Sequence, residues 1–159
     1  MKALTIGAGL GVLMALGGCA PGGPGMSRQL LSVSMTGLQQ VPGPGDSDGN
    51  GTVQIRLTPR DGRLCWDLYA RAIEPATAAH IHRGAAGTAG PPVVALTTPD
   101  ANGRSQGCAT LDPMLARQIA MQSHDFYVNV HNPAFPTGAI RGQLRGGGGG
   151  PSPRQPRVG

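Results

Sequence analysis

Two runs of alternating apolar and polar residues constrain this chain most, because such alternation buries one face of an extended strand and leaves the other face in solvent. Every second residue is apolar in residues 52–58, and the same period of two returns between Leu64 and Ala72. Residues 60–62 between the two runs read Arg-Asp-Gly, which is typical of a tight turn. The two runs therefore predict a β-hairpin.

The rest of the chain favours an all-β fold. Its 27 glycines and 15 prolines among 159 residues disfavour a helical bundle. One short amphipathic helix is expected at Pro113–Gln122, with Asp112 as its N-cap and proline at its first position. Further strands are expected at residues 31–35, 79–83, 93–96, 106–111, 126–131 and 139–144. About eight short strands at this spacing predict one β-sandwich or barrel.

The N-terminal residues resemble the export signal of a bacterial lipoprotein. Lys2 precedes an apolar run, Ala3–Leu16, which has the length of a signal-peptide core and is too short to span a bilayer. The run leads into Leu-Gly-Gly-Cys at residues 16–19, which resembles a lipobox and implies cleavage before Cys19 and lipid attachment to its sulfur. The alternative is an ordinary secretory signal followed by a cysteine at this place by chance.

These features predict the organisation and the location of the protein. The tail is rich in glycine, proline and arginine, with little apolar content to bury, so we expect it to be disordered. Because no aspartate follows Cys19, similarity to lipoprotein sorting signals favours the periplasmic face of the outer membrane, and otherwise another extracytoplasmic site. The predicted segments are a signal peptide at 1–18, a flexible tether at 19–28, a folded domain at 29–145 and the tail at 146–159.

The basic residues outnumber the acidic ones, with 13 Lys and Arg against 8 Asp and Glu and a formal net charge of +5. The arginines are scattered in sequence over turns, strands and tail. Nucleic-acid binding normally needs a clustered basic face with aromatic or helical readout elements, and the sequence shows neither. We therefore expect no nucleic-acid partner and interpret the charge as solvated surface.

Two cysteines remain once Cys19 is assigned to lipid attachment, namely Cys65 and Cys108. In an exported protein two such residues are expected to form a disulfide, and a bridge that closes a loop of some 40 residues would stabilise the fold by roughly 3–4 kcal/mol. The alternatives are two buried free thiols, or two cysteines on opposite sides of the fold.

Three of the four histidines are placed to meet. In an extended Ala-His-Ile-His segment, His80 and His82 point to the same face, and in the strand 126–131 the residue His131 shares a face with Tyr127 and Asn129. If the two faces meet, three imidazoles converge, and three nitrogen donors suit zinc or copper. The alternative is structural, with these histidines and Asn129 hydrogen-bonding the glycine-rich loop after His82.

Two segments carry a family resemblance. AAHIHRGAAGTAGPPVVAL at residues 78–96 and FYVNVHNPAFPTGAIRGQL at residues 126–144, with Cys108 between them, resemble the CHRD domain, named after its occurrence in chordin. The resemblance covers roughly residues 29–145 and implies an immunoglobulin-like or superoxide-dismutase-like Greek-key β-sandwich. Bacterial members are exported or lipid-anchored domains of undefined role. Ala139 stands where many members have glutamate, which puts any role of that carboxylate in doubt here.

The sequence offers little for catalysis. No nucleophile is accompanied by a recognisable base, and the four histidines are too few for a copper–zinc dismutase site, which needs about six with an aspartate. Arg141 is expected to pair with Asp67 or Asp125 across strands. The sequence therefore predicts a lipid-anchored, non-enzymatic binding or structural module with an unknown protein partner. The alternative is a protein that binds one copper or zinc ion through His80, His82 and His131.

Overall fold

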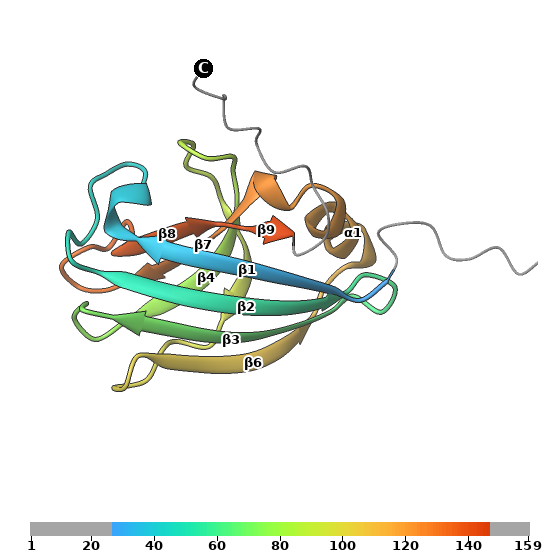
Figure 1. The fold of residues 1–159 in the computed structure, drawn as a ribbon, viewed down its shortest axis with the longest axis horizontal. Helices are drawn as coiled ribbons and strands as arrows, with labels where there is room; N and C mark the ends of the chain where they lie inside the picture. The colour runs from blue at the N-terminus through green and yellow to red at the C-terminus, as the bar shows by residue number, and fades with distance from the viewer. Residues whose placement is uncertain (1–26, 147–159) are drawn as a thin grey trace, which may run out of the picture.

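The computed structural model describes residues 27–146, which form one antiparallel sheet and one short α-helix (Figure 1). The predicted signal peptide, Cys19 and nearly all of the predicted tether and tail lie outside these residues. The elements are β1 (Gln29–Thr36), η1 (Gly37–Gln39), β2 (Asn50–Thr58), β3 (Arg63–Arg71), β4 (Ala78–Arg83), β5 (Pro92–Leu96), β6 (Arg104–Thr110), α1 (Pro113–Met121), η2 (Ser123–Asp125), β7 (Phe126–His131), β8 (Ile140–Gln143) and β9 (Arg145–Gly146).

The sheet folds over on itself and nearly closes. Its strand order is β5-β4-β7-β8-β1-β2-β3-β6, with β9 pairing beside β1. Figure 1 shows β1, β2, β3 and β6 in front of β4 and β7, so the single sheet forms two layers. The edge strands β5 and β6 approach each other where the hydroxyl of Ser105 donates to the carbonyl of Thr97, the residue after β5. The prediction of an all-β fold with one short helix is confirmed, in a form between a sandwich and a barrel.

Alternation in the strands builds the core between the two layers. In β2 and β3 every second residue is fully or almost fully buried, and the two strands pair from Asn50 opposite Arg71 to Thr58 opposite Arg63. Gly62 adopts a positive φ of 65° in the turn between them, which favours glycine. The hairpin predicted from residues 52–72 is therefore confirmed. Core side chains of the two layers include Leu31, Ile55, Leu57, Leu64, Leu68, Ile81, Phe126, Val128 and Val130.

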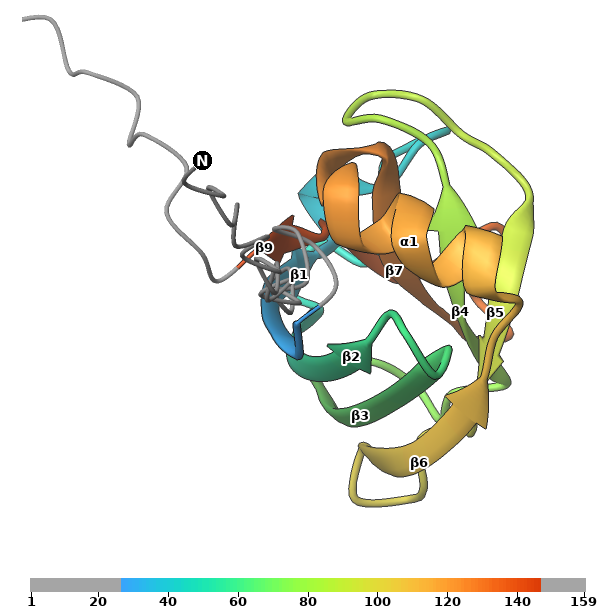
Figure 2. The ribbon, with the colours of Figure 1, turned by 90° about the vertical axis from the view of Figure 1, so that its right-hand side faces the viewer.

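The helix α1 covers one end of the folded sheet (Figure 2). Asp112 caps it as predicted, because its carboxylate accepts hydrogen bonds from the backbone N–H groups of Met114 (2.8 Å) and Leu115 (3.2 Å). Ala116 and Ile119 are the buried residues of the helix, so its apolar stripe closes that end of the core. No helix within residues 27–146 is long and apolar enough to cross a membrane.

The predicted disulfide is confirmed, and it joins the edge strand β6 to the sheet. Cys65 in β3 lies directly opposite Cys108 in β6, and the two are 43 residues apart in sequence. Cys108 is exposed and Cys65 is half-buried, so the bridge lies on the outer face of the sheet. It therefore restrains the chain without contributing to the core.

Candidate metal centre

Three histidines meet on one face of the sheet because β4 and β7 are antiparallel neighbours. In their register His80 lies opposite Asn129, and His131 lies opposite Ala78. His131 is thus a diagonal neighbour of His80, at a distance that long side chains bridge. His82 follows two residues after His80 on the same face. The two segments that the sequence predicts to converge therefore do so.

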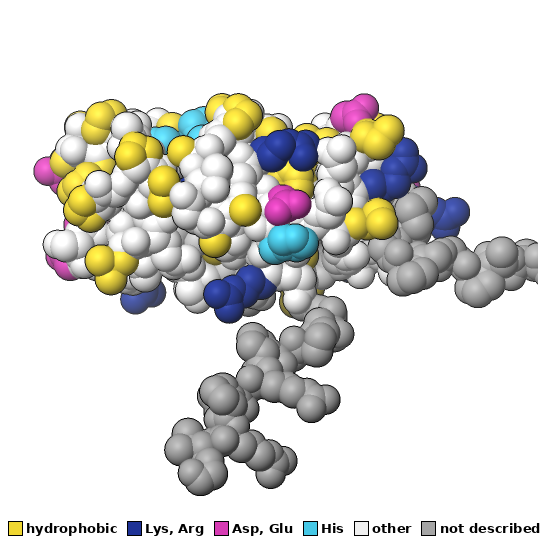
Figure 3. Space-filling view, turned by 90° about the horizontal axis from the view of Figure 1, so that it is seen from above, with side chains coloured by type: hydrophobic (Ala, Val, Ile, Leu, Met, Phe, Trp, Pro, Cys, Tyr) yellow, Lys and Arg dark blue, Asp and Glu magenta, His cyan; other side chains and the backbone are white. Residues whose placement is uncertain are grey.

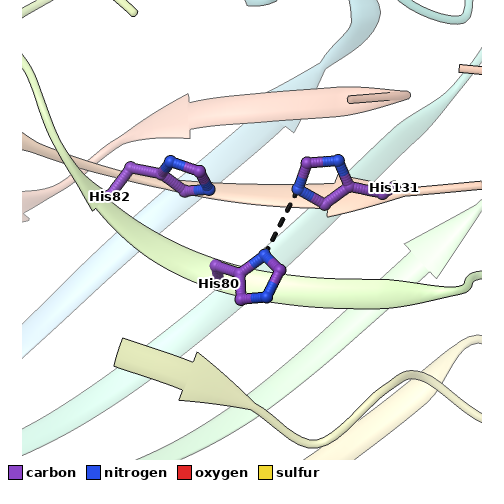
Figure 4. A group of neighbouring side chains, drawn as sticks. All are labelled: His80, His82 and His131. Atoms are coloured by element: carbon purple, nitrogen blue, oxygen red, sulfur yellow. Dashed lines mark hydrogen bonds between the residues drawn. The ribbon is translucent and has the colours of Figure 1, made fainter. Parts of the chain in front are cut away.

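The three rings point toward one another (Figure 4). The Nδ1 atom of His80 is 3.3 Å from the Nε2 atom of His131. The ring centroid of His82 lies 5.6 Å from that of His80 and 6.0 Å from that of His131. One nitrogen can be chosen from each ring so that the three nitrogens all lie within 4.8 Å of one another. The cluster is thus compact enough for one small ion to contact all three rings.

Backbone carbonyls fix the orientation of two of the rings. The Nδ1 atom of His82 lies 2.9 Å from the carbonyl oxygen of Gly90, and the Nδ1 atom of His131 lies 3.0 Å from that of Pro136. A carbonyl can only accept, so in each neutral ring Nδ1 carries the hydrogen and Nε2 keeps its lone pair. Histidines that bind metals usually donate their second ring N–H to such an oxygen. Both rings are therefore held in the tautomer that a metal ligand needs.

The environment favours the neutral form of His80 and His82. His82 is 8% exposed, and burial is the main reason why its pKa lies below its ordinary value, with the charges of His131 and Arg141 lowering it further. The hydrogen bond from His82 to Gly90 acts in the opposite direction. Burial also lowers the pKa of His80, and the neighbouring imidazoles add to the effect. Because only the neutral ring can bind a metal, these shifts favour coordination at neutral pH.

Tyr127 supports the cluster from the next position along the sheet. It lies opposite His82 in the register, and the two rings stack with centroids 4.8 Å apart and an interplanar angle of 13°. The guanidinium carbon of Arg141 lies 3.5 Å from the centroid of the same tyrosine ring. Tyr127 therefore fixes His82 by stacking and supplies a cation–π contact to a buried arginine.

The glycine-rich loop between β4 and β5 is held by the same group of residues. The hydroxyl of Tyr127 accepts a hydrogen bond from the N–H of Gly90 (3.2 Å) and lies 3.3 Å from its carbonyl oxygen. The amide of Gln143 donates to the carbonyl of Gly84 (2.7 Å), and Arg141 donates to that of Ala85 (3.0 Å). A Cβ atom at Gly90 would collide with the carbonyl of Arg83, so the loop needs glycine there. The loop is thus anchored at both of its ends.

Several expectations from the sequence need correction. Arg141 does not pair with Asp67 or Asp125: β8 is separated from β3 by β1 and β2, and Asp67 instead pairs with Arg104 (3.7 Å). Arg141 is 1% exposed, its Nη1 atom has no hydrogen-bond partner among the described residues, and burial lowers its pKa.

Asn129 does not bind the glycine-rich loop. Its amide nitrogen donates to the carbonyl of Thr137 (3.3 Å), in the segment before β8. Sequence reasoning also missed the roles of Gln143 and Tyr127 in holding the loop. For Gln143 the sequence did carry a signal. Arg141 and Gln143 are two residues apart in β8 and therefore lie on the same face of the strand, opposite the face of Ile140 and Gly142.

The cluster has the donor set of a zinc or copper site. A tetrahedral zinc ion with bonds of about 2.0–2.1 Å holds two ligand nitrogens about 3.3–3.4 Å apart. The Nδ1 atom of His80 and the Nε2 atom of His131 are 3.3 Å apart as hydrogen-bond partners, so an ion bound to both would replace the hydrogen between them. The three ligand nitrogens lie within 4.8 Å of one another, so the longest nitrogen–nitrogen distance must shorten by about 1.5 Å at most. Rotation of the side chains can supply this change. Calcium and magnesium prefer oxygen donors, so three imidazoles do not suit them. His124, the fourth histidine, is exposed beside Asp125 (3.6 Å) and takes no part.

The fold and the site define a nearly closed antiparallel β domain with a three-imidazole cluster on one face of its sheet. The family model of the CHRD domain matches residues 31–144, and the chain belongs to this family. The matched range includes β4, the glycine-rich loop, β7 and β8, and therefore the whole cluster with its supporting residues. Comparison with curated proteins and with solved structures found no match.

Proposed function

We propose that this CHRD-domain protein binds one copper or zinc ion through His80, His82 and His131, as a non-enzymatic module anchored by lipid outside the cytoplasm. One observation carries the metal assignment. The Nδ1 atoms of His82 and His131 are held by backbone carbonyls at 2.9 and 3.0 Å, so Nε2 carries the lone pair in both rings; that of His82 has no partner among the described residues, and that of His131 faces Nδ1 of His80 at 3.3 Å.

A second observation supports the assignment. The Nε2 atom of His82 is buried and has no hydrogen-bond partner among the described residues. An unsatisfied buried polar atom costs about 1–3 kcal/mol, so its presence calls for an explanation. A metal ion that accepts this lone pair satisfies the atom and recovers that free energy.

Copper and zinc both fit three imidazoles, and the proposed location favours copper. Outside the cytoplasm the oxidising setting stabilises Cu(II), which imidazole binds more strongly than it binds Zn(II). Three protein ligands leave a coordination position for water or another small ligand. We propose metal binding or buffering and not catalysis, because the described residues around the cluster include no carboxylate placed as a general base.

The membrane location rests on the sequence alone. Cys19 follows the apolar run and the Leu-Gly-Gly sequence of a lipobox, and it would carry the acyl chains. Expression with a labelled fatty acid tests this part separately. The wild type should take up the label and enter the detergent phase on phase separation, whereas Cys19→Ala should do neither. Label uptake by Cys19→Ala would overturn the anchor.

The metal assignment is tested by titration of the purified protein with Cu(II) and Zn(II). We expect one ion per chain, with affinity lost in a variant in which His80, His82 and His131 are all alanine. His124→Ala is the matched control, because it removes an exposed histidine outside the cluster and should bind as the wild type does. Equal affinity in the triple variant and the wild type would refute the assignment.

A second candidate function is architectural, and the bond between His82 and Gly90 favours it. In that case the histidines brace the glycine-rich loop and the protein binds another protein through its exposed loops. A folded wild type that binds neither metal would favour this function, provided that the triple alanine variant loses stability while His124→Ala does not.

A further inference from the structure

The fold gathers at one end of the domain the arginines that the sequence scatters. This end, called here the basic end, is where β1 and β3 begin, β2 finishes and α1 covers the core (Figure 2). It carries six arginines against three carboxylates, and the opposite end carries two arginines against four carboxylates, while Arg145 and Asp67 lie at the middle of the strands. The basic-end residues are Arg28, Arg56, Arg60, Arg63, Arg83 and Arg117 with Asp61, Asp112 and Asp125; those opposite are Arg71 and Arg104 with Asp46, Asp48, Glu74 and Asp100.

We propose that the basic end docks on an anionic phospholipid surface. Figure 3 shows arginine side chains at the right-hand end of the view, with others in the centre and along the lower edge, and acidic side chains along the left-hand edge, in the centre and at the upper right. A domain with this polarity is attracted to a negative bilayer and turned so that its basic end faces the lipid.

The arginines of the basic end are not paired with carboxylates of residues 27–146, although Arg83 donates to the Gln118 side chain (2.7 Å) and Arg63 to the sulfur of Cys108 (3.6 Å). Among the described residues the carboxylate ion pairs are Arg104 of the opposite end with Asp67, and His124 with Asp125. No basic-end arginine therefore lies within 4.0 Å of a carboxylate in the described part of the chain. Arg28, Arg60 and Arg117 are exposed. Their charge is available to an external anion and is not neutralised within the fold.

Large apolar side chains are exposed at the same end. Leu30 is 48% exposed at the start of β1, and Met114 and Met121 of α1 are 61% and 72% exposed. Among the described residues these are three of the four large apolar side chains that stand out in solvent, the other being Leu38. Apolar side chains beside arginines suit the boundary between headgroups and acyl chains, where each type finds its preferred surroundings.

The position of the predicted lipid anchor agrees with this orientation. Nine residues, 20–28, separate Cys19 from Gln29, the first residue of β1, and the ten Cα–Cα steps between these two reach at most about 35 Å. The nine residues of β2 span about 30 Å. An anchor at Cys19 therefore holds the basic end, where the chain enters the domain, within about 35 Å of the bilayer, and the charge of that end supplies the orientation. Docking itself needs only the charge and apolar side chains of the domain, so it stands apart from the metal assignment.

Sedimentation with vesicles tests the proposal. The probe is residues 20–159, which retain the whole core and the family match but lack the anchor, with vesicles of phosphatidylglycerol and phosphatidylcholine or of phosphatidylcholine alone. The protein should sediment with the anionic vesicles at low salt, dissociate from them at high salt and not bind the neutral vesicles. Absent binding to anionic vesicles, or equal binding to neutral ones, would overturn the proposal.

Matched variants locate the surface. Arg60→Gln with Arg117→Gln at the basic end should weaken vesicle binding about 25-fold, at roughly 5-fold for each arginine. Arg71→Gln with Arg104→Gln removes the same net charge from the opposite end and should change binding less than about 3-fold. Equal losses in the two variants would show attraction by net charge alone and overturn the docking surface.

A third variant separates lipid from soluble polyanions. Met114→Ser with Met121→Ser keeps every charge, so it should weaken binding to anionic vesicles and leave binding to heparin unchanged. Heparin binding at least as tight as vesicle binding, with no effect of the methionine changes on the vesicles, would mark a general anion surface and overturn the assignment to lipid. Circular dichroism of each variant confirms that the domain is folded.

Discussion

Removal of the disulfide is the change whose effect on stability can be worked out most directly. Cys65 and Cys108 are 43 residues apart, so the bridge removes a long loop from the unfolded ensemble, and in the chain-entropy model this stabilises the fold by about 4 kcal/mol. Cys108 is exposed and Cys65 half-buried, so replacement by alanine leaves little cavity in the core. The loss should come almost entirely from the restored freedom of the unfolded chain.

That loss is large compared with the total stability of a domain, which is about 5–15 kcal/mol. Urea unfolding of Cys65→Ala with Cys108→Ala, followed by circular dichroism, should show a midpoint lower by about 2 M for an m-value of about 2 kcal/mol/M. Reduction of the wild type should give a similar midpoint because the bridge is accessible. A loss below about 1 kcal/mol, with the m-value unchanged, would refute the argument from loop entropy.

Three further predictions concern the cluster, the loop and the helix. The unfolding free energy of the metal-free protein should fall as the pH is lowered below 6.5, because burial lowers the pKa of His80 and His82 and the unfolded chain then binds more protons. Urea titrations in the presence of a chelator at about pH 5 and 8 check this. The double variant His80→Asn with His82→Asn should show a smaller dependence of the unfolding free energy on pH. Gln143→Ala should cost about 1–3 kcal/mol in a urea titration, because its amide nitrogen lies 2.7–2.8 Å from three backbone carbonyls, and an unchanged midpoint would contradict the role assigned to it. Asp112→Ala should cost about 1 kcal/mol in thermal unfolding through loss of the helix cap, whereas Asp61→Ala in the β2–β3 turn should cost less.

The strands could be predicted from the sequence because burial on one face leaves a period of two. The hairpin β2–β3 is the clearest case, and the cap at Asp112 made the helix equally predictable. The order of the strands could not be predicted in the same way, because pairings such as β8 with β1 join residues about 100 positions apart and leave no local signal. The two-residue strand β9 is likewise too short for any period to show.

The histidine cluster was predictable, but its support was not. His80, His82 and His131 share a face by alternation, and only the pairing of β4 with β7 had to be supposed. The stacking of Tyr127 on His82 and the contacts of Arg141 depend on the register of three strands at once. The expectation that Arg141 pairs with an acid failed for this reason, because charge complementarity in sequence carries no information on which strands are neighbours.

The distribution of charge shows the same limit. Arg28, Arg60 and Arg117 are far apart in sequence, and each alone has the pattern of a solvated surface residue. The antiparallel arrangement brings the start of β1, the turn after β2 and the helix α1 to one end of the domain. A basic end therefore arises from topology and not from a basic segment.

The most direct test of the metal assignment is a crystal structure of the protein loaded with one equivalent of zinc, with anomalous data collected at the zinc edge. We expect one anomalous peak at about 2.0–2.1 Å from a ring nitrogen of each of His80, His82 and His131, with the Nδ1 atoms of His82 and His131 still bonded to Gly90 and Pro136. A zinc ion bound elsewhere, or these three rings unchanged in a crystal of zinc-loaded protein, would contradict the account.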